Sequence, residues 1–215
     1  MSLGAGKVAG TGAVERDGVE TEKRRQILEG ARRVFTASGF DGASMGEIAK
    51  AAGVSKGTLY VYFDSKDALF EALTIAQKRD LAEALFALNV EDPDMRGVLT
   101  RLGRIYLREM SKPEHVSLVR MVIGACEKFP HLGRAFFEAG PALGVGRLAA
   151  YLDAQVAAGR LREADTTLAA KHFLHLCQAG LFTRLLFSAG GIESEGELNH
   201  RVDEAVRIFL AGYAP

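Results

Sequence analysis

The chain has 215 residues, of which 48% are hydrophobic and 25% are charged, a balance typical of a globular protein with a sizeable core. This composition excludes an intrinsically disordered chain. Lysine plus arginine and aspartate plus glutamate each number 27, so the formal net charge is zero and any nucleic-acid site must rest on local charge placement.

The amino-terminal residues, MSLGAGKVAGTGAVERDG, are rich in glycine and lack the continuous apolar segment of a signal peptide. We expect residues 1–20 to form a flexible tail and the protein to be cytoplasmic. Residues 172–192 form an apolar stretch about as long as a membrane span, but Arg184 lies near its centre. Burial of this stretch against protein costs less than placing that charge in a bilayer, so we predict a helix with packing partners on most sides and no membrane partner.

Apolar residues recur at every third or fourth position and no extended run alternates with period two, which predicts an all-α fold. The first helix spans about residues 21–38 and ends at Gly39. A second helix begins at Ser44, which is expected to form a capping box with Glu47, and ends at Gly53. The tight turn at Gly53 leads directly into a third, short helix, and this pair of helices predicts a helix-turn-helix.

The third helix follows Ser55 and turns Leu59 and Phe63 inward when it is drawn at 100° per residue. In a helix-turn-helix the second of the two helices lies in the major groove of DNA. Lysine and threonine reach base edges or phosphates there, tyrosine hydroxyls donate to phosphate oxygens, valine fits a thymine methyl group, and glycine permits close approach. The residues expected to face DNA from this helix are Lys56, Gly57, Thr58, Tyr60, Val61 and Tyr62.

A fourth helix is expected from Ser65 to about Leu88. Lys66 lies in its first turn, where a cation is unfavourable for the helix dipole but is close to the backbone N–H groups that bind phosphate. We therefore expect Lys66 to contact a DNA phosphate.

The remainder of the chain, about residues 90–213, is predicted to be a bundle of long helices. Gly159 and the pair Gly190-Gly191 are expected to end helices. The expected helix starts are at Pro93, Pro113, Pro130, Pro141, Asp165 and Ser194, the last in a second capping box with Glu197.

The segments ILEGARRVFTASGFDG and GASMGEIAKAAGVSKGTLYVYFDSKDALF closely resemble the DNA-binding domain of the TetR family of bacterial transcriptional regulators, over about residues 21–70. This resemblance implies an all-helical homodimer that binds a roughly palindromic double-stranded DNA operator, as a repressor released by a small hydrophobic effector. The family's DNA-contacting positions correspond here to Ser44, Met45, Gly46, Lys56, Gly57, Thr58, Tyr60, Tyr62 and Lys66.

The segments KFPHLGRAFFEAGP, LDAQVAAGRLREAD and AAKHFLHL are loosely similar to the C-terminal domain of AefR- or AcrR-like members. By that resemblance the helices after Asp165 and Ser194 form the dimer interface, and the preceding helices enclose an effector pocket. We therefore expect a helix-turn-helix domain over residues 21–66 and an effector-binding and dimerisation domain over residues 67–215. The expected pocket residues are Ile105, Tyr106, Met110, Val119, Met121, Val122, Cys126, Phe136, Phe137, Phe173 and Leu176.

Other interpretations of the second domain remain open. A solid core would make the protein a constitutive or partner-controlled DNA-binding dimer without an effector pocket. A catalytic role for Cys126 with His131 is disfavoured because no third orienting residue accompanies them. His172 and His175 have a spacing that can bind a metal, but without a third ligand they are interpreted as core or interface histidines, and no metal or cofactor is predicted.

Overall fold

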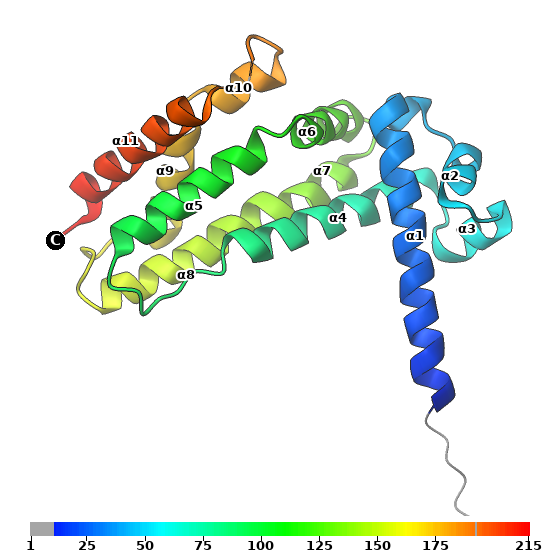
Figure 1. The fold of residues 1–215 in the computed structure, drawn as a ribbon, viewed down its shortest axis with the longest axis horizontal. Coiled ribbons are helices and arrows are strands. Elements are labelled where there is room, and N and C mark those ends of the chain that lie inside the picture. The colour runs from blue at the N-terminus through cyan, green and yellow to red at the C-terminus, as the bar shows by residue number, and fades with distance from the viewer. Residues whose placement is uncertain (1–10, 192) are drawn as a thin grey trace, which may run out of the picture. The chain divides into compact units, whose positions relative to one another are not determined.

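The computed structural model describes residues 11–191 and 193–215, and all regular secondary structure in these ranges is helical (Figure 1). The predicted all-α class is therefore confirmed. The chain forms two compact units, the first ending at Leu73 and the second beginning at Thr74, and each unit is described by itself.

The first unit contains α1 (Thr11–Gly42), α2 (Met45–Ala52), α3 (Lys56–Tyr62) and the first turns of α4 (Lys66–Leu85). The second unit contains the rest of α4, then α5 (Met95–Met110), α6 (Pro113–Cys126), α7 (Pro130–Phe137), the π-helical turn η1 (Glu138–Ala142), α8 (Leu143–Ala157), α9 (Thr166–Gln178), α10 (Leu181–Leu186) and α11 (Glu195–Tyr213).

Helix α1 begins earlier than the sequence predicts, at Thr11 rather than near Thr21. Of the expected tail, residues 1–10 lie outside the described residues, whereas residues 11–20 are helical and continuous with the predicted helix. This segment contains no proline, and extending an existing helix adds one hydrogen bond for each residue fixed. The predicted stop at Gly39 is confirmed, because Gly39 interrupts the helical backbone with φ 70° and ψ 179°.

Local side-chain and glycine signals define the helix-turn-helix as predicted. The Ser44 hydroxyl accepts from the Glu47 N–H at 3.2 Å, and the Glu47 carboxylate accepts from the Ser44 N–H at 3.0 Å, which completes the capping box. Gly53 ends α2 in the left-handed region at φ 67°, and its N–H donates to the Lys50 carbonyl. These caps satisfy backbone groups that the ends of a short helix leave without partners.

The core of the first unit includes the start of α4. Phe70 packs edge-on against Phe35 and Phe40, with ring centroids 5.0 and 5.1 Å apart, and Leu69 beside it is fully buried. Because these α4 residues complete the core beneath α1, the division between the units falls at Leu73, beyond the expected domain boundary at residues 66/67.

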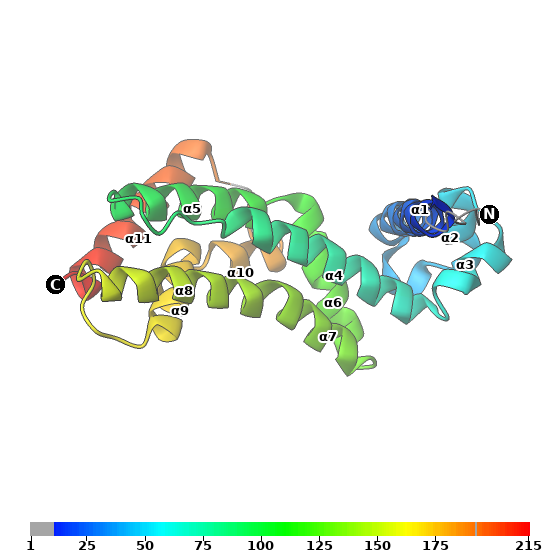
Figure 2. The ribbon, with the colours of Figure 1, turned by 90° about the horizontal axis from the view of Figure 1, so that it is seen from below.

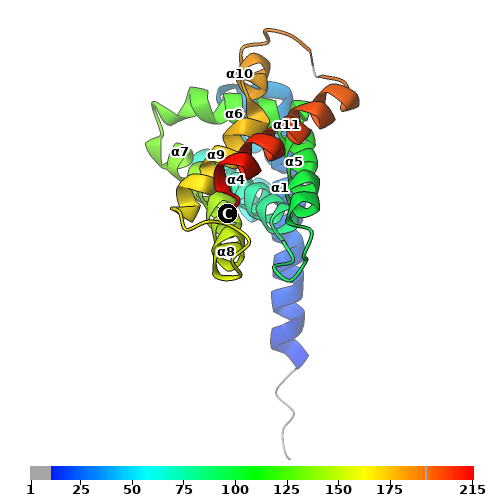
Figure 3. The same cartoon turned by 90° about the vertical axis from the view of Figure 1, so that its left-hand side faces the viewer.

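The second unit packs α11 against α5 and α9, and α8 against α9, as the end view shows (Figure 3). Its core contains Leu99, Phe173, Val202 and Phe209, all at most 1% exposed. Figure 2 shows α8 running along this bundle. Among the described residues, no helix combines the length and hydropathy needed to cross a lipid bilayer.

Two of the predicted helix starts are wrong. Helix α5 begins at Met95 rather than Pro93, because the Asp94 carboxylate accepts from the Gly97 N–H at 2.9 Å and caps the helix. Pro141 starts no helix and instead lies inside η1, which joins α7 to α8 without a break. Proline lacks an N–H and crowds the preceding turn, and a locally widened turn accommodates both effects.

The single long helix expected after Asp165 is also wrong. Asp165 caps α9 as predicted, but Ala179 and Gly180 adopt left-handed conformations, with φ of 32° and 84°, and separate α9 from α10. The predicted stop at Gly159 and the capping box at Ser194 are confirmed.

Close packing of α1 on the end of α2 predicts that Gly30→Ala destabilises the first unit. A Cβ at Gly30 would lie 2.6 Å from Ala52 Cα, so the helices must separate. We expect a loss of about 1–3 kcal/mol in the free energy of unfolding, measured by chemical denaturation. Gly124→Ala in α6 is the control, because a Cβ at Gly124 would meet no atom within 4 Å and alanine favours a helix. Equal stability changes in both variants would contradict the close contact.

Candidate functional site

Helix α3 presents one buried and one exposed face, as predicted. Leu59 is fully buried and Phe63 is nearly so, whereas Val61 is 81% exposed and Tyr60 is 49% exposed. Lys56 and Gly57 are also exposed, and Thr58 and Tyr62 are half-buried. Large exposed apolar and aromatic side chains on a helix-turn-helix helix are available for contact with base edges and methyl groups.

The start of α2 adjoins Lys56 through Gly46. A Cβ at Gly46 would lie 3.0 Å from the Lys56 Cε, so the absent side chain leaves the space in which the lysine stem lies. Ser44 is engaged within its own helix cap, where its hydroxyl donates to the Glu47 carboxylate at 2.7 Å, and Met45 is half-buried. Of the residues near the start of α2 that are expected to contact DNA, Lys56 therefore has the polar group most available for that contact.

Lys66 is not free in the way that the expected phosphate contact requires. Its ammonium donates to the carbonyl oxygens of Phe40, Asp41 and Ala43 at 2.7, 3.3 and 3.1 Å, and lies 4.6 Å from the centroid of the Phe40 ring. These carbonyls follow the break in α1 and lack helical partners. Lys66 thus ties the end of α1 to the start of α4, and a phosphate would have to compete with three protein acceptors.

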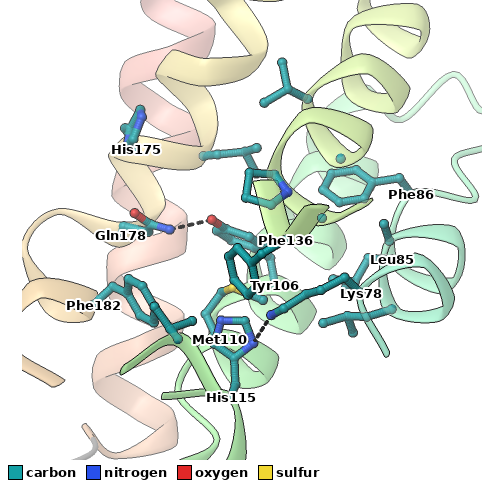
Figure 4. A pocket seen from close by; sticks show the side chains of 18 of the residues that line it. Lys78, Leu85, Phe86, Tyr106, Met110, His115, Phe136, His175, Gln178 and Phe182 are labelled. Atoms are coloured by element: carbon teal, nitrogen blue, oxygen red, sulfur yellow. Dashed lines mark hydrogen bonds between the residues drawn. The ribbon is translucent and has the colours of Figure 1, made fainter. Parts of the chain in front are cut away.

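The second unit contains a cavity of about 290 Å³, into which side chains of α4, α5, α6, α9 and α10 and of the α7–α8 segment project (Figure 4). Its walls are mainly apolar, with Leu81, Leu85 and Phe86 contributed by and just after α4. The polar side chains that line it are Lys78, Tyr106, His115, Lys171, His175 and Gln178.

Only some of the expected pocket residues lie at this cavity. Tyr106, Met110, Val119 and Phe136 line it, as predicted. The expected residues that lie elsewhere are Ile105, Met121, Val122, Cys126, Phe137, Phe173 and Leu176.

The misplaced residues follow ordinary packing. Phe173 is fully buried against Phe209, with ring centroids 5.4 Å apart, and leaves no room for a ligand. Phe137 is 59% exposed, pointing away from the core. The Cys126 thiol donates to the Ile123 carbonyl within α6, and Leu176 lines a separate surface hollow with residues of α11. The helical spacing of apolar residues therefore does not predict which of these residues face a cavity.

The most unusual group in the cavity is Lys78, which is 4% exposed. Its Nζ lies 2.9 Å from His115 Nδ1 and 4.6 Å from the centroid of the Phe136 ring (Figure 4). Burial lowers the pKa of Lys78 to about 7, and burial together with the nearby Lys78 charge lowers the pKa of His115 to about 3. His115 is therefore neutral, and when Lys78 is protonated its ammonium donates to Nδ1, which leaves the imidazole proton on Nε2.

A second polar pair lines the same cavity. Gln178 Nε2 donates to the Tyr106 hydroxyl at 2.5 Å, and burial raises the pKa of Tyr106 to about 12 (Figure 4). The tyrosine keeps its proton, which leaves its O–H able to donate to a ligand.

Sequence reasoning missed Lys78 and His115. Lys78 stands in the run QKRD, which is typical of a solvated face. Lys78 follows Thr74 by four residues and precedes Leu81 by three, so these side chains lie on one face of α4, the buried one. This spacing is the sequence pattern that could have identified Lys78 as buried.

The sequence predicts that His172 and His175 are core or interface histidines, and their exposure contradicts the core position, whereas the interface position stays a prediction. His172 Nδ1 lies 2.7 Å from the Tyr213 hydroxyl, and His175 lines the cavity. The described residues include no group of three His, Cys, Asp or Glu side chains that could hold a metal ion.

These features define a helix-turn-helix protein with a second helical unit that contains a cavity. Residues 27–73 match the family model for bacterial regulatory proteins of the TetR family, and residues 97–215 match the model for the C-terminal domain of AefR-like transcriptional repressors. The chain belongs to the TetR family.

Solved structures of similar proteins extend over the whole fold. A TetR-family transcriptional regulator from Mesorhizobium loti is 31% identical, with a TM-score of 0.85 over 91% of this chain and 98% of that one. The Flavonoid-responsive Regulator FrrA is 33% identical, with a TM-score of 0.76 and the same coverage.

Curated relatives match over the amino-terminal part. The HTH-type transcriptional regulator UidR of Escherichia coli is 42% identical over 78 residues, which are 35% of this chain and 39% of UidR. The HTH-type transcriptional repressor AcnR of Corynebacterium glutamicum is 37% identical over 79 residues, 37% of this chain and 42% of AcnR. The matched region thus spans about two fifths of these relatives.

Burial of Lys78 predicts a specific dependence of stability on pH. The unfolded lysine keeps its proton up to about pH 10.5, whereas the folded one releases it near pH 7. Between these values the unfolded state binds more protons, so stability rises with pH. Lys78→Met should remove this rise and stabilise the protein near pH 7 by on the order of a few kcal/mol.

The measurement is chemical denaturation of the wild type and of Lys78→Met across that pH window. Lys128→Met, which changes an exposed lysine just after α6, is the control and should keep the wild-type slope. Parallel pH profiles for the wild type and Lys78→Met would mean that Lys78 is solvated.

Proposed function

We propose that this protein is a DNA-binding transcriptional repressor that leaves a roughly palindromic operator when a small, largely apolar effector occupies the cavity of the second unit. The exposed face of α3, with Tyr60 and Val61 turned to solvent beside Lys56, is the observation that carries this proposal. In a protein of zero net charge, such a face concentrates groups suited to base edges and phosphates in one place.

Effector control is supported by the cavity and by a relative. A volume of about 290 Å³ lies near the lower end of the roughly 300–1,000 Å³ found for ligand pockets. The relative FrrA, whose fold matches over most of the chain, carries the name of a flavonoid-responsive regulator. The cavity therefore favours effector control over the alternative of a constitutive DNA-binding dimer with a filled second domain.

Dimerisation through α9 and α11 is part of the proposal, on the basis of the apolar side chains that these helices leave exposed. Several apolar residues of this region that would favour a helical partner are already buried within their own subunit, namely Leu181, Leu185 and Val202. Leu168 on α9 and Ile208 on α11 remain 46% and 45% exposed. Pairing of these helices would bury them and would hold two α3 helices at a fixed spacing, about 34–36 Å for successive major grooves.

Substitution of the exposed α3 residues tests the DNA-binding role. Lys56→Ala and Val61→Ala should each weaken binding to an operator selected from random DNA by about 1–3 kcal/mol and change which operator variants are preferred, because both side chains face the proposed groove. Fluorescence anisotropy across a set of single-base operator variants measures both effects.

Lys128→Ala is the matched control for loss of one positive charge, because Lys128 is exposed in the second unit. It should leave the ranking of operators unchanged. If Lys56→Ala and Val61→Ala lowered affinity for every sequence equally, α3 would not be reading bases.

The dimer surface is tested by Ile208→Glu. A charge at this position should weaken dimerisation by at least about 2 kcal/mol, because the interface would have to bury it. Sedimentation equilibrium gives the dissociation constant. Ile105→Glu on α5 is the control, since Ile105 is 44% exposed and Ile208 is 45% exposed. An unchanged dimer for Ile208→Glu would place the interface elsewhere.

A further inference from the structure

We propose that the effector is a small apolar acid whose carboxylate binds to the ammonium of Lys78, with its apolar part against the walls from α4 to α10. This inference rests on the proposed function of the cavity and names the chemistry of its ligand.

The charge of the cavity lining is the first argument. Two lysines and two histidines line the cavity, whereas no aspartate or glutamate is among the lining residues whose side chains the structure describes. Lys78 forms no ion pair with any carboxylate whose side chain the structure describes, and burial lowers its pKa. A buried cation without a counterion costs free energy, and an anionic ligand removes that cost.

The hydrogen-bonding capacity of Lys78 is the second argument. An ammonium has three N–H donors. Among the described residues, Lys78 has one hydrogen-bond partner, His115 Nδ1, while the Phe136 ring lies against the positive charge. Two donors thus remain for a ligand, which matches the two oxygens of a carboxylate.

Two glycines of the η1–α8 segment leave space for side chains from α4 and just after it. A Cβ at Gly140 would lie 3.2 Å from Lys78 Cδ, and a Cβ at Gly144 would lie 2.8 Å from the Phe86 ring. Both glycines face α4 and its end from the η1–α8 segment. The missing side chain at Gly140 therefore leaves room for the Lys78 stem, and the missing side chain at Gly144 leaves room for the Phe86 ring.

A carboxylate fits better than a dianion such as a phosphate monoester. Lys78 is the one buried cation of the lining, since Lys171 and His175 are exposed and His115 is neutral. A second negative charge would remain unpaired against the apolar walls. The O–H of Tyr106, held by Gln178, offers a further donor for a neutral acceptor on the ligand.

The test measures direct binding of matched acid and amide pairs, from benzoate and naphthalene-2-carboxylate to octanoate and decanoate, by isothermal titration calorimetry on the full-length protein. Acids that bind should do so roughly 10- to 100-fold more tightly than their amides. Lys78→Met should abolish this preference while the protein stays at least as stable as the wild type, and Lys128→Met should retain it.

Proton uptake gives a second readout. Near pH 8 the acid should bind with uptake of close to one proton, because it restores the charge of Lys78. Among the described residues, the other titratable side chains that line the cavity with Lys78 are Tyr106, His115, Lys171 and His175. Lys78 also borders an adjoining surface hollow, whose titratable residues besides Lys78 and His115 are Glu109, Lys112 and Glu114. Lys78→Met should bind without this uptake, whereas uptake that survives the substitution would assign the proton to another group.

The absence of any preference for acids across the panel, or a preference that persists in Lys78→Met, would overturn the proposal. The same ligands are then added to the protein–operator complex. Release of DNA by amides as readily as by acids would contradict the acid site but support effector control. Binding of acids through Lys78 without any change in operator affinity would support the acid site and contradict effector control.

Discussion

Helix α4 has to bury side chains in two separate cores, and both units depend on this constraint. Leu69, Phe70 and Leu73 complete the core of the helix-turn-helix unit, while Lys78 and Leu85 belong to the second unit. Neither proline nor glycine interrupts the helix between them, so both sets of side chains project from one continuous helix. Lys78, at the cavity, and Lys66, which is tied to the end of α1, thus lie on the same helix.

The irregular backbone of the second unit is explained by the cavity. Pro141 lies in the widened turn η1, and Gly140 and Gly144 on either side of it accommodate Lys78 and Phe86. Regular α-helix with larger side chains would close this space, and the second unit would gain packing at the expense of the cavity. Burial of Lys78 also lowers stability near neutral pH, because desolvation disfavours its charged form. Destabilising features concentrated at one cavity are characteristic of a binding site rather than of a core.

The parts of the fold that local chemistry determines could be predicted from the sequence. The capping boxes at Ser44 and Ser194, the turn at Gly53 and the inward side of α3 depend on residues within one or two turns of each other. The cavity depends on how distant helices meet, and so Phe136 and Phe173, similar in sequence context, end up at the cavity wall and in the solid core respectively. Family resemblance identified the helix-turn-helix surface, but it could not show that the donors of Lys66 are already occupied.

The two lysines of α4 differ in how many hydrogen-bond acceptors of the protein surround them, and this difference distinguishes a structural role from a binding role. Lys66 meets three backbone carbonyls and an aromatic ring, so each of its N–H donors has a protein acceptor. Lys78 is more deeply buried, yet within the described part of the chain it meets one histidine nitrogen and one ring. Since buried polar groups normally find partners, the remaining donors of Lys78 suit an acceptor other than the side chains that the structure describes. The Lys66 ammonium thus holds the end of α1 to the start of α4. The Lys78 ammonium, twelve residues further along the same helix, has N–H donors available to a ligand.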